Sequence, residues 1–410
     1  MGAVTSANAS PASPPAPTPW GLVVLLGSLT AMGPLAIDMY LPSLPAIGAA
    51  LKADAGQTQA TVAAFLAGMA AGQLVYGPAS DRVGRRGPIL FGCAVFVLAS
   101  IGCALAQNVD QLLVGRFVQA LGACAGGVVV RAVVRDQFSH TDTARILSLM
   151  MLIMGLAPIL APMLGGVLLG LGDWSWNFWF MAAVGLAIGV AAFLRLKESR
   201  SEATAIQAGR ENPFQSYLAV LRERRLVGYA LCGALNGATL FTYIASSPEV
   251  LMGTYHVPVA VFPFLFATNA VAVIGSSQLN RLALRRATTD EVLSRASAVS
   301  LVVGVMLALA AVTGVGGLWT VGPLLFLLLG SYGFMAGNTT AGALSVDPLR
   351  SGATSALIGA ASFAAGALAS SLAGVFHDGT ARPMALVMLA ALVGSAVSLR
   401  TLALPRGVQG

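Results

Sequence analysis

Charged residues are scarce in this sequence. Of its 410 residues only 10% are Asp, Glu, Lys or Arg, whereas 57% are hydrophobic. Soluble domains carry about a quarter charged residues, so the composition excludes an ordinary soluble protein. It predicts a polytopic membrane protein, and the 47 glycines suit membrane helices that pack closely through small residues.

Cysteine and histidine are also few. The four cysteines lie within apolar runs and show no metal or redox spacing, so we expect small core residues and no disulfide. The three histidines fall near helix ends without forming a metal cluster. Because the helices carry no paired-carboxylate, Ser/His or His/Cys constellation, the sequence predicts neither an enzyme nor a metal site. It also gives no indication of nucleic acid binding.

Long apolar runs separated by polar or Gly/Pro residues predict an all-α fold of twelve transmembrane helices. The expected ranges are 20–41, 58–79, 88–107, 112–134, 146–170, 177–196, 226–247, 259–281, 292–313, 318–340, 354–376 and 381–403. The hydrophilic stretch 197–225 lies between the sixth and seventh. We therefore expect two six-helix halves, 20–196 and 226–403, joined by a cytoplasmic linker, as is common in secondary transporters.

The chain ends are expected to lie outside this fold. Residues 1–19 are rich in Pro, Ala and Ser and have no charged side chain, so we expect a disordered tail. They lack a basic n-region and are not expected to be a signal peptide. Residues 404–410 form a short second tail.

The basic residues predict the orientation in the membrane. With the N-terminus inside, 20 of the 23 fall at cytoplasmic connections and helix ends, and the exceptions are Lys52, Arg116 and Arg382. This bias predicts a cytoplasmic membrane protein with both termini cytoplasmic. It also accounts for the net charge of +7 without an anionic partner.

Asp38 is the single carboxylate in the apolar run from Trp20 to Pro45. An ionised acid in the hydrocarbon core costs at least about 2.5 to 3.5 kcal/mol, so it is a functional candidate that needs a partner. If the helix ends near Leu41, Asp38 lies at the far headgroups, where an acid costs little. If the helix continues past Pro42 and Pro45, Asp38 lies deeper in the membrane, and a functional role for this carboxylate is favoured.

Helix 4 contains a second intramembrane charge, Arg116, followed by Gln119 and Gly122. An arginine inside a membrane helix is rare, and it is the expected partner of Asp38. The alternative is that Arg116 extends its side chain to the outer headgroups.

Two further segments have distinctive patterns. The connection after the second helix reads GPASDRVGRRG over 77–87, in which glycines predict the helix end and a tight turn, and opposite charges can pair. Its marked residues are Gly77, Asp81, Arg82, Gly84, Arg85 and Arg86. Helix 5 carries Pro158, Pro162, Gly165 and Gly166, which predict a bendable, closely packed helix. Taken alone, these are a positive-inside loop and kinked packing.

Together these patterns resemble a known family. The spacing G-x-x-x-D-R-x-G-R-R resembles the loop signature of the major facilitator superfamily, and Arg116 with Gln119 and Gly122 is similar to its second signature. The P-x-x-G-G ending of the helix 5 segment resembles the antiporter signature of proton-driven drug exporters. With Asp38-Met39-Tyr40-Leu41-Pro42, the chain from Trp20 onward resembles the bicyclomycin and chloramphenicol resistance (Bcr/CflA) branch.

The resemblance implies a proton-coupled antiporter that exports small lipophilic drugs, with Asp38 and Arg116 coupling the proton. It implies that Asp81 meets the N-terminus of helix 11 and that an arginine of the loop pairs with Asp136 at the end of helix 4. Gly87 departs from the family, where a basic residue is common. We expect a monomer surrounded by membrane lipid, with no cofactor and the proton gradient as the energy source.

Polar and aromatic residues in the helices are expected to line a substrate cavity, although each alone could form an interhelical hydrogen bond. They are Tyr40, Gln119, Asn236, Phe241, Tyr243, Asn269 and Asn338. Two alternatives remain. One is a proton-linked exporter of an endogenous metabolite such as a sugar or amino acid, and the other is a non-transporting sensor, against which the absence of a soluble domain argues.

Overall fold

The computed structural model describes residues 20–138, 140–210 and 212–404, and all regular structure within them is helical. Within these ranges twelve helices are long and apolar enough to cross a membrane, which confirms the predicted fold class. The first half consists of α1 (Trp20–Asp38), α2 (Leu44–Leu51), α3 (Ala55–Val83), α4 (Arg86–Ala104), α5 (Val109–Gln137), α6 (His140–Leu171) and α7 (Ser175–Arg195). The second consists of α10 (Arg224–Pro248), α11 (Phe262–Ala283), α12 (Thr289–Thr313), α13 (Leu318–Val346), α14 (Ser351–Val375) and α15 (Arg382–Ser398).

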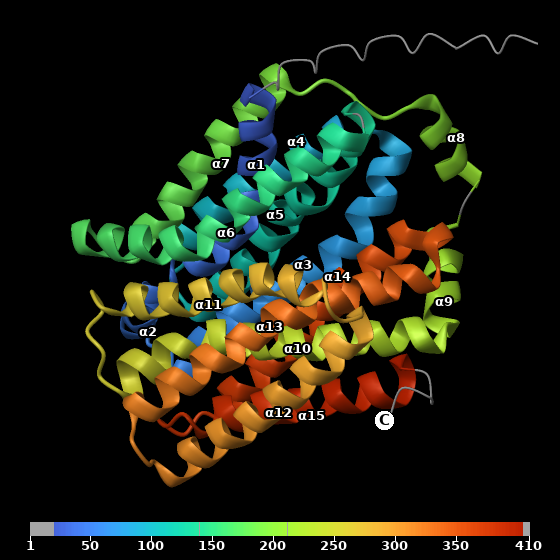
Figure 1. The fold of residues 1–410 in the computed structure, drawn as a ribbon. Coiled ribbons are helices and arrows are strands. Elements are labelled where there is room, and N and C mark those ends of the chain that lie inside the picture. Colours follow the sequence, from blue (N-terminus) through green and yellow to red (C-terminus); the bar gives the residue numbers. More distant parts are fainter. Residues whose placement is uncertain (1–19, 139, 211, 405–410) are drawn as a thin grey trace, which may run out of the picture.

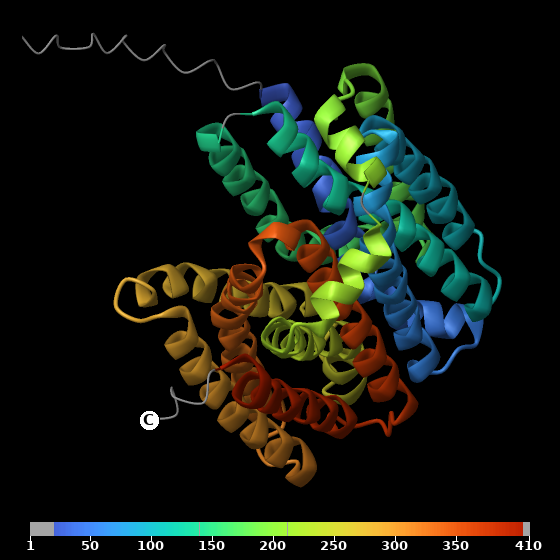
Figure 2. The ribbon, with the colours of Figure 1, turned by 90° about the vertical axis from the view of Figure 1, so that its right-hand side faces the viewer.

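The stretch between the halves is more regular than a plain linker. It contains two short helices, α8 (Glu202–Arg210) and α9 (Pro213–Arg222). The hydroxyl of Tyr217 in α9 donates to the Leu74 carbonyl of α3 at 3.0 Å, so the linker packs on the first half. In Figure 2 the yellow-green linker crosses from one bundle to the other. The predicted tails, 1–19 and 405–410, lie outside the described residues.

Polar caps define where the two central helices of the first half begin. The Asp54 carboxylate accepts from the Gln57 N–H at 2.8 Å, and the Gln57 side chain accepts from the Asp54 N–H at 3.0 Å, which is a capping box for α3. Asn108 caps α5 by accepting from the Gln111 N–H at 2.9 Å. These starts set the positions of the residues that follow on α3 and α5.

Glycines let helix α5 lie close to its neighbours. A Cβ atom added to Gly68 of α3 would clash with the Phe117 carbonyl of α5, and one added to Gly126 of α5 would clash with the Leu29 carbonyl of α1. Membrane helices associate through such van der Waals contact, because lipid provides no hydrophobic drive between them. Helix α5 is therefore packed against α1, α3 and α4 at the centre of the first half. The four cysteines are buried, as predicted for small core residues.

The two halves meet along α3 and α14, which lie side by side (Figure 1). At one end Gln59 donates to the Ser246 hydroxyl at 2.6 Å and to the Ser370 carbonyl at 3.2 Å. At the other end, where the 77–87 loop lies, the halves are separated by a cavity of about 710 Å³. The molecule is thus closed at one end and hollow at the other.

A glycine pair in α5 tests this packing. We expect Gly126→Ala to lower the free energy of unfolding by about 1 to 3 kcal/mol, because the added methyl group overpacks the contact with Leu29. The adjacent Gly127→Ala is the matched control, since a Cβ there meets nothing within 4 Å. Thermal unfolding of the detergent-solubilised protein measures both. Equal stability of the two variants would contradict the close α1–α5 contact.

Candidate functional site

Asp38 is the last residue of α1 and lies at a break in the first membrane span. The chain passes through a 3₁₀ turn (Leu41–Ser43) into α2, and the whole span from Trp20 to Leu51 has 32 residues. Asp38 lies about 27 Å along a length of about 48 Å, at about 1.5 Å per residue. Its side chain is 3% exposed, and its Oδ1 atom has no hydrogen-bond partner among the described residues. The structure therefore favours the deeper of the two predicted positions.

Arg116 does not pair with Asp38, contrary to our expectation. The ion pairs formed within the described residues include neither side chain. The guanidinium lies against Tyr40 instead, with its central carbon 4.2 Å from the Tyr40 ring centroid. Asp38 instead lies within electrostatic range of the Tyr243 hydroxyl in the second half.

An aromatic cage surrounds the Arg116 guanidinium. The Phe65 ring lies 4.3 Å away and the Phe178 ring 5.8 Å, in addition to Tyr40. Arg116 is 0% exposed, which rules out the alternative that it extends to the headgroups. Its Nη1 donates to Gln119 at 2.6 Å, whereas Nε and Nη2 have no partner among the described residues. The guanidinium is held by ring faces and retains two unused donors.

The expected antiporter helix packs directly on the break after Asp38. Pro158 and Pro162 both lie inside the continuous helix α6. One turn further on, a Cβ atom on Gly165 would clash with the Met39 carbonyl, so only glycine allows α6 to lie this close to the break. Gly166 faces Pro263 of the second half, with 3.6 Å between its built Cβ and the proline Cγ. Helix α6 thus touches the backbone directly beside Asp38.

The 77–87 loop begins later than the sequence suggested. Helix α3 continues through Gly77 and Pro78 to Val83, because its hydrogen bonds run on past both residues, and it ends at Gly84. Gly84 has φ +100°, a conformation that side-chain-bearing residues rarely adopt. A Cβ there would also lie 2.5 Å from the Glu198 carboxylate.

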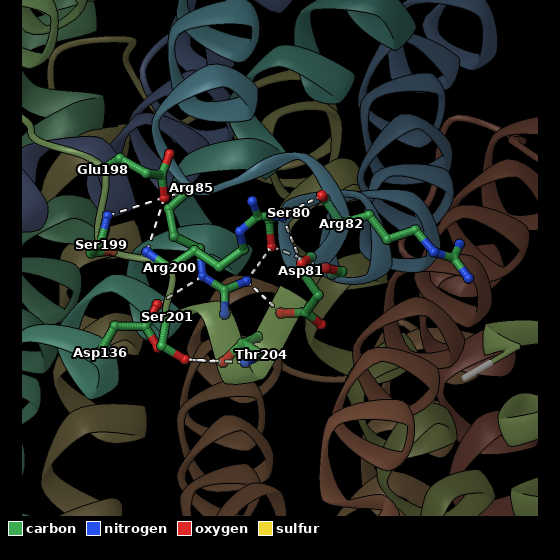
Figure 3. A network of polar contacts seen from close by, with 11 residues as sticks. Ser80, Asp81, Arg82, Arg85, Asp136, Glu198, Ser199, Arg200, Ser201 and Thr204 are labelled. Carbon is green, nitrogen blue, oxygen red and sulfur yellow. Dashed lines mark hydrogen bonds and ion pairs between the residues drawn. The ribbon is translucent and has the colours of Figure 1, made fainter. Parts of the chain in front are cut away.

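Arg85 is the centre of the polar network beside this loop (Figure 3). Its Nε donates to Asp136 Oδ2 at 2.8 Å, and its Nη1 donates to the Ser80 hydroxyl at 2.9 Å and to the Asp81 carboxylate. The expected pairing of a loop arginine with Asp136 is thus present. Burial alone would lower the pKa of Arg85, but the hydrogen bonds to Asp136 and Asp81 outweigh it and raise the pKa.

The implied contact of Asp81 with the eleventh membrane helix, α14, is absent. Asp81 bonds to Arg85 instead and is 43% exposed, because the cavity separates it from the start of α14. The other two arginines of the loop point elsewhere. Arg82 donates to the Ala208 carbonyl at 3.3 Å and Arg86 to the Phe193 carbonyl at 2.8 Å.

Glu198 is a member of this network that the sequence analysis missed. Its carboxylate accepts from the backbone N–H groups of Arg85, Arg86, Ser199 and Arg200 at 2.8 to 3.1 Å. Burial alone would raise the pKa of Glu198, but these four donors outweigh it and lower the pKa below the ordinary 4.5. The sequence did contain one indication of this contact: Glu198 follows helix 6, and that connection lies on the same side of the predicted membrane as the 77–87 loop.

The seven residues expected to line one substrate cavity do not do so in this conformation. Tyr40 shares a 2.9 Å hydrogen bond with Thr61, and Gln119 donates to Ser100 at 2.7 Å, both beside the Arg116 cage. In the second half Asn269 donates to the Tyr243 hydroxyl at 2.8 Å. Asn338 pairs with Asn280, Asn236 donates to Met335, and Phe241 packs on Phe363. Because protein partners satisfy most of these groups, they form separate packed clusters.

Twelve membrane-length helices among the described residues, in two halves with a cavity between them at one end, form an architecture common to secondary transporters. The Major Facilitator Superfamily profile matches residues 26–374, and the chain belongs to that family.

Relatives support this assignment. An uncharacterized MFS-type transporter, YdgK of Bacillus subtilis, is 35% identical over 379 residues, covering 91% of this chain and 93% of that protein. A bicyclomycin resistance protein homolog of Haemophilus influenzae is 30% identical over 376 residues, covering 92% and 94%. The multidrug resistance protein MdtL of Escherichia coli is 36% identical over 225 residues, covering 55% and 56%.

Solved structures share the fold. A D-xylose-proton symporter superposes with a TM-score of 0.73 at 12% identity, covering 94% of this chain and 98% of that one. A bacterial homolog of the human lysosomal transporter Spinster, in an inward-facing and occupied conformation, gives 0.69 at 13%, covering 94% and 96%. At such low identity these likenesses concern the fold alone.

Replacing Glu198 tests the linker contact. The lowered pKa means that the ionised carboxylate stabilises the folded protein above pH 4.5, and that this contribution is lost as the pH falls through the lower folded-state value. We expect Glu198→Gln to lower the melting temperature near neutral pH and to match the wild type at low pH. Glu202→Gln, at an exposed site in α8, is the control. If the melting temperature of Glu198→Gln were lower than that of the wild type by the same amount at every pH, this electrostatic account would be contradicted.

Two variants of Tyr40 test the cage. Tyr40→Phe keeps the ring beneath Arg116 and loses only the Thr61 hydrogen bond, whereas Tyr40→Leu loses both. A desolvated cation–π contact contributes about 2 kcal/mol, so we expect Tyr40→Leu to be less stable than Tyr40→Phe by about that amount. Chemical unfolding in mild detergent measures the difference. If both variants had the same stability, the ring face would not be what holds Arg116.

Proposed function

We propose that this transporter exports small lipophilic compounds, including drugs, across the cytoplasmic membrane in exchange for protons, as a member of the Bcr/CflA branch. The relatives named for bicyclomycin and multidrug resistance support the substrate class. The observation that carries the proton coupling is Asp38, a buried carboxyl group with an unpartnered oxygen in the first membrane span. A carboxyl group in that setting is the expected carrier of a proton.

The separation of Asp38 from Arg116 suggests how the carrier works. A protonated Asp38 is neutral and needs no counter-ion, which fits the conformation described here. Loss of the proton leaves a buried anion that costs at least about 2.5 to 3.5 kcal/mol unless it gains a partner. The free Nε and Nη2 donors of Arg116 can supply that partner once Tyr40 moves aside. Protonation would then separate the pair and lower substrate affinity, and deprotonation would restore it.

The orientation follows from the distribution of the basic residues. We place both termini and the 77–87 loop in the cytoplasm. The cavity then opens toward the cytoplasm, and the conformation is inward-facing. In the same proposal Asp38 takes its proton from the outside when the cavity faces outward and releases it to the cytoplasm in the inward-facing state. The protein works as a monomer in membrane lipid, and its only energy source is the proton gradient.

The loop network acts as a latch in this scheme. We propose that closing the cavity brings Asp81 to the N-terminus of α14, where the helix dipole favours an anion. Asp81 would exchange its contact with Arg85 for that helix end, while Asp136 retains Arg85. This would hold the outward-facing state.

The test is proton movement in reconstituted vesicles when chloramphenicol or a sulfonamide is added. We expect substrate-evoked proton flux from the wild type and from Asp110→Asn, an exposed control acid of the same half, and none from Asp38→Asn. Asp38→Asn should be expressed and folded normally, since the substitution leaves a neutral group of similar size. Undiminished uphill export by Asp38→Asn would disprove the assignment.

A further inference from the structure

The cavity between the halves is bordered by one acid and five arginines. They are Asp81, Arg82, Arg85, Arg131, Arg135 and Arg350. Three of the arginines have protein partners: Arg85 holds Asp81 and Asp136, Arg82 bonds to Ala208, and Arg350 bonds to Asp347 at 2.6 Å. Neither Arg131 nor Arg135 forms an ion pair or hydrogen bond with a residue that the structure describes.

Arg131 and Arg135 lie one turn apart on the same face of α5. Residues at this spacing have Cβ atoms about 5 to 6 Å apart, and like charges there repel. Both side chains are exposed at the cavity wall. Asp136, the acid next to Arg135 in sequence, is already bonded to Arg85. A pair of adjacent guanidinium groups without an acid is therefore available for a negative charge from outside the chain.

The rest of the wall suggests what carries that charge. Val128 and Leu147 contribute apolar surface near the arginines, and Ser355 contributes a hydroxyl group from the second half. The volume of about 710 Å³ lies within the range of about 300 to 1,000 Å³ that is typical of sites for small molecules. Guanidinium groups bind carboxylate, sulfonate or phosphate oxygens through paired hydrogen bonds.

We propose that Arg131 and Arg135 bind the acidic group of an amphipathic anion, and that small lipophilic acids are substrates taken up by this cavity. The transport role rests on the proposed export function, whereas the binding site does not. The same pair of positive charges disfavours lipophilic cations. Charge at this wall thus selects among compounds of similar size and apolar character.

Binding of two matched probes tests the proposal. 1-Naphthoate and its neutral amide, 1-naphthamide, have nearly the same shape and differ in charge. We measure both by titration calorimetry on the full chain in nanodiscs of zwitterionic lipid. The carboxylate can accept charge-assisted hydrogen bonds from both guanidinium groups and the neutral amide cannot, so we expect naphthoate to bind the wild type at least about tenfold more tightly than naphthamide.

The variants locate the preference. Arg131→Gln/Arg135→Gln should bind both probes equally, whereas Arg285→Gln/Arg286→Gln, an exposed pair that loses the same charge outside the cavity, should keep the wild-type preference. Arg131→Lys/Arg135→Lys retains the charge and should retain part of the preference. Size-exclusion profiles check that each variant is folded. Equal binding of the probes by the wild type, or a preference that survives in the Gln double variant, would overturn the proposal.

Two further arms separate this proposal from its rivals. One rival is that the arginines bind only lipid headgroups. In that case naphthoate will not bind in zwitterionic discs, whereas added phosphatidylglycerol will bind the wild type but not the Gln double variant. That result would overturn the proposal. Probe binding in nanodiscs and substrate-evoked proton flux in vesicles are separate measurements on the same wild-type protein. If the wild type prefers naphthoate but shows no proton flux, the export function is refuted and the anion site is retained. If it shows proton flux but no preference for naphthoate, the anion site is refuted and the export function is retained.

Discussion

Close contact between helix backbones is the constraint on which this structure depends. Lipid offers no hydrophobic drive for helix association, so the helices are held by surface contact, and here the closest contacts place a glycine on a neighbouring carbonyl. Gly126 meets Leu29, Gly68 meets Phe117 and Gly165 meets Met39. These contacts bring α1 and α3 against α5, and α6 against the break after α1. They also remove Asp38 and Arg116 from water.

The buried charges are stabilised in unequal ways. Arg116 lies among aromatic faces and has a hydrogen bond to Gln119, so its positive charge is compensated without an acid. Asp38 has an oxygen with no partner among the described residues, so nothing there compensates the cost of burying an ionised carboxylate. Of these two buried groups the guanidinium is therefore the better compensated, and Gly165 of α6 lies on the carbonyl of Met39, the residue that follows Asp38.

The two ends of the molecule differ in how the halves are joined. Gln59 holds them together at one end, whereas a cavity separates them at the other. Beside that cavity, Glu198 binds the backbone N–H groups of the loop and so attaches the linker to the first half. The linker is therefore part of the loop network. Asp81 and Arg85 of that network border the cavity between the halves.

The sequence by itself determined the twelve helices and the places of Asp38, Arg116 and the Arg85 loop along them. It could do so because a bilayer requires long apolar helices with internally bonded backbones, and because a charged residue is conspicuous within them. Only the tertiary structure decided which side chains meet. The Tyr40 ring lies on the Arg116 guanidinium, Glu198 joins the loop, and Arg131 and Arg135 rather than the expected polar residues line the cavity. These contacts depend on how each helix is rotated and how closely its glycines allow it to approach, and the order of residues along one helix does not contain that information.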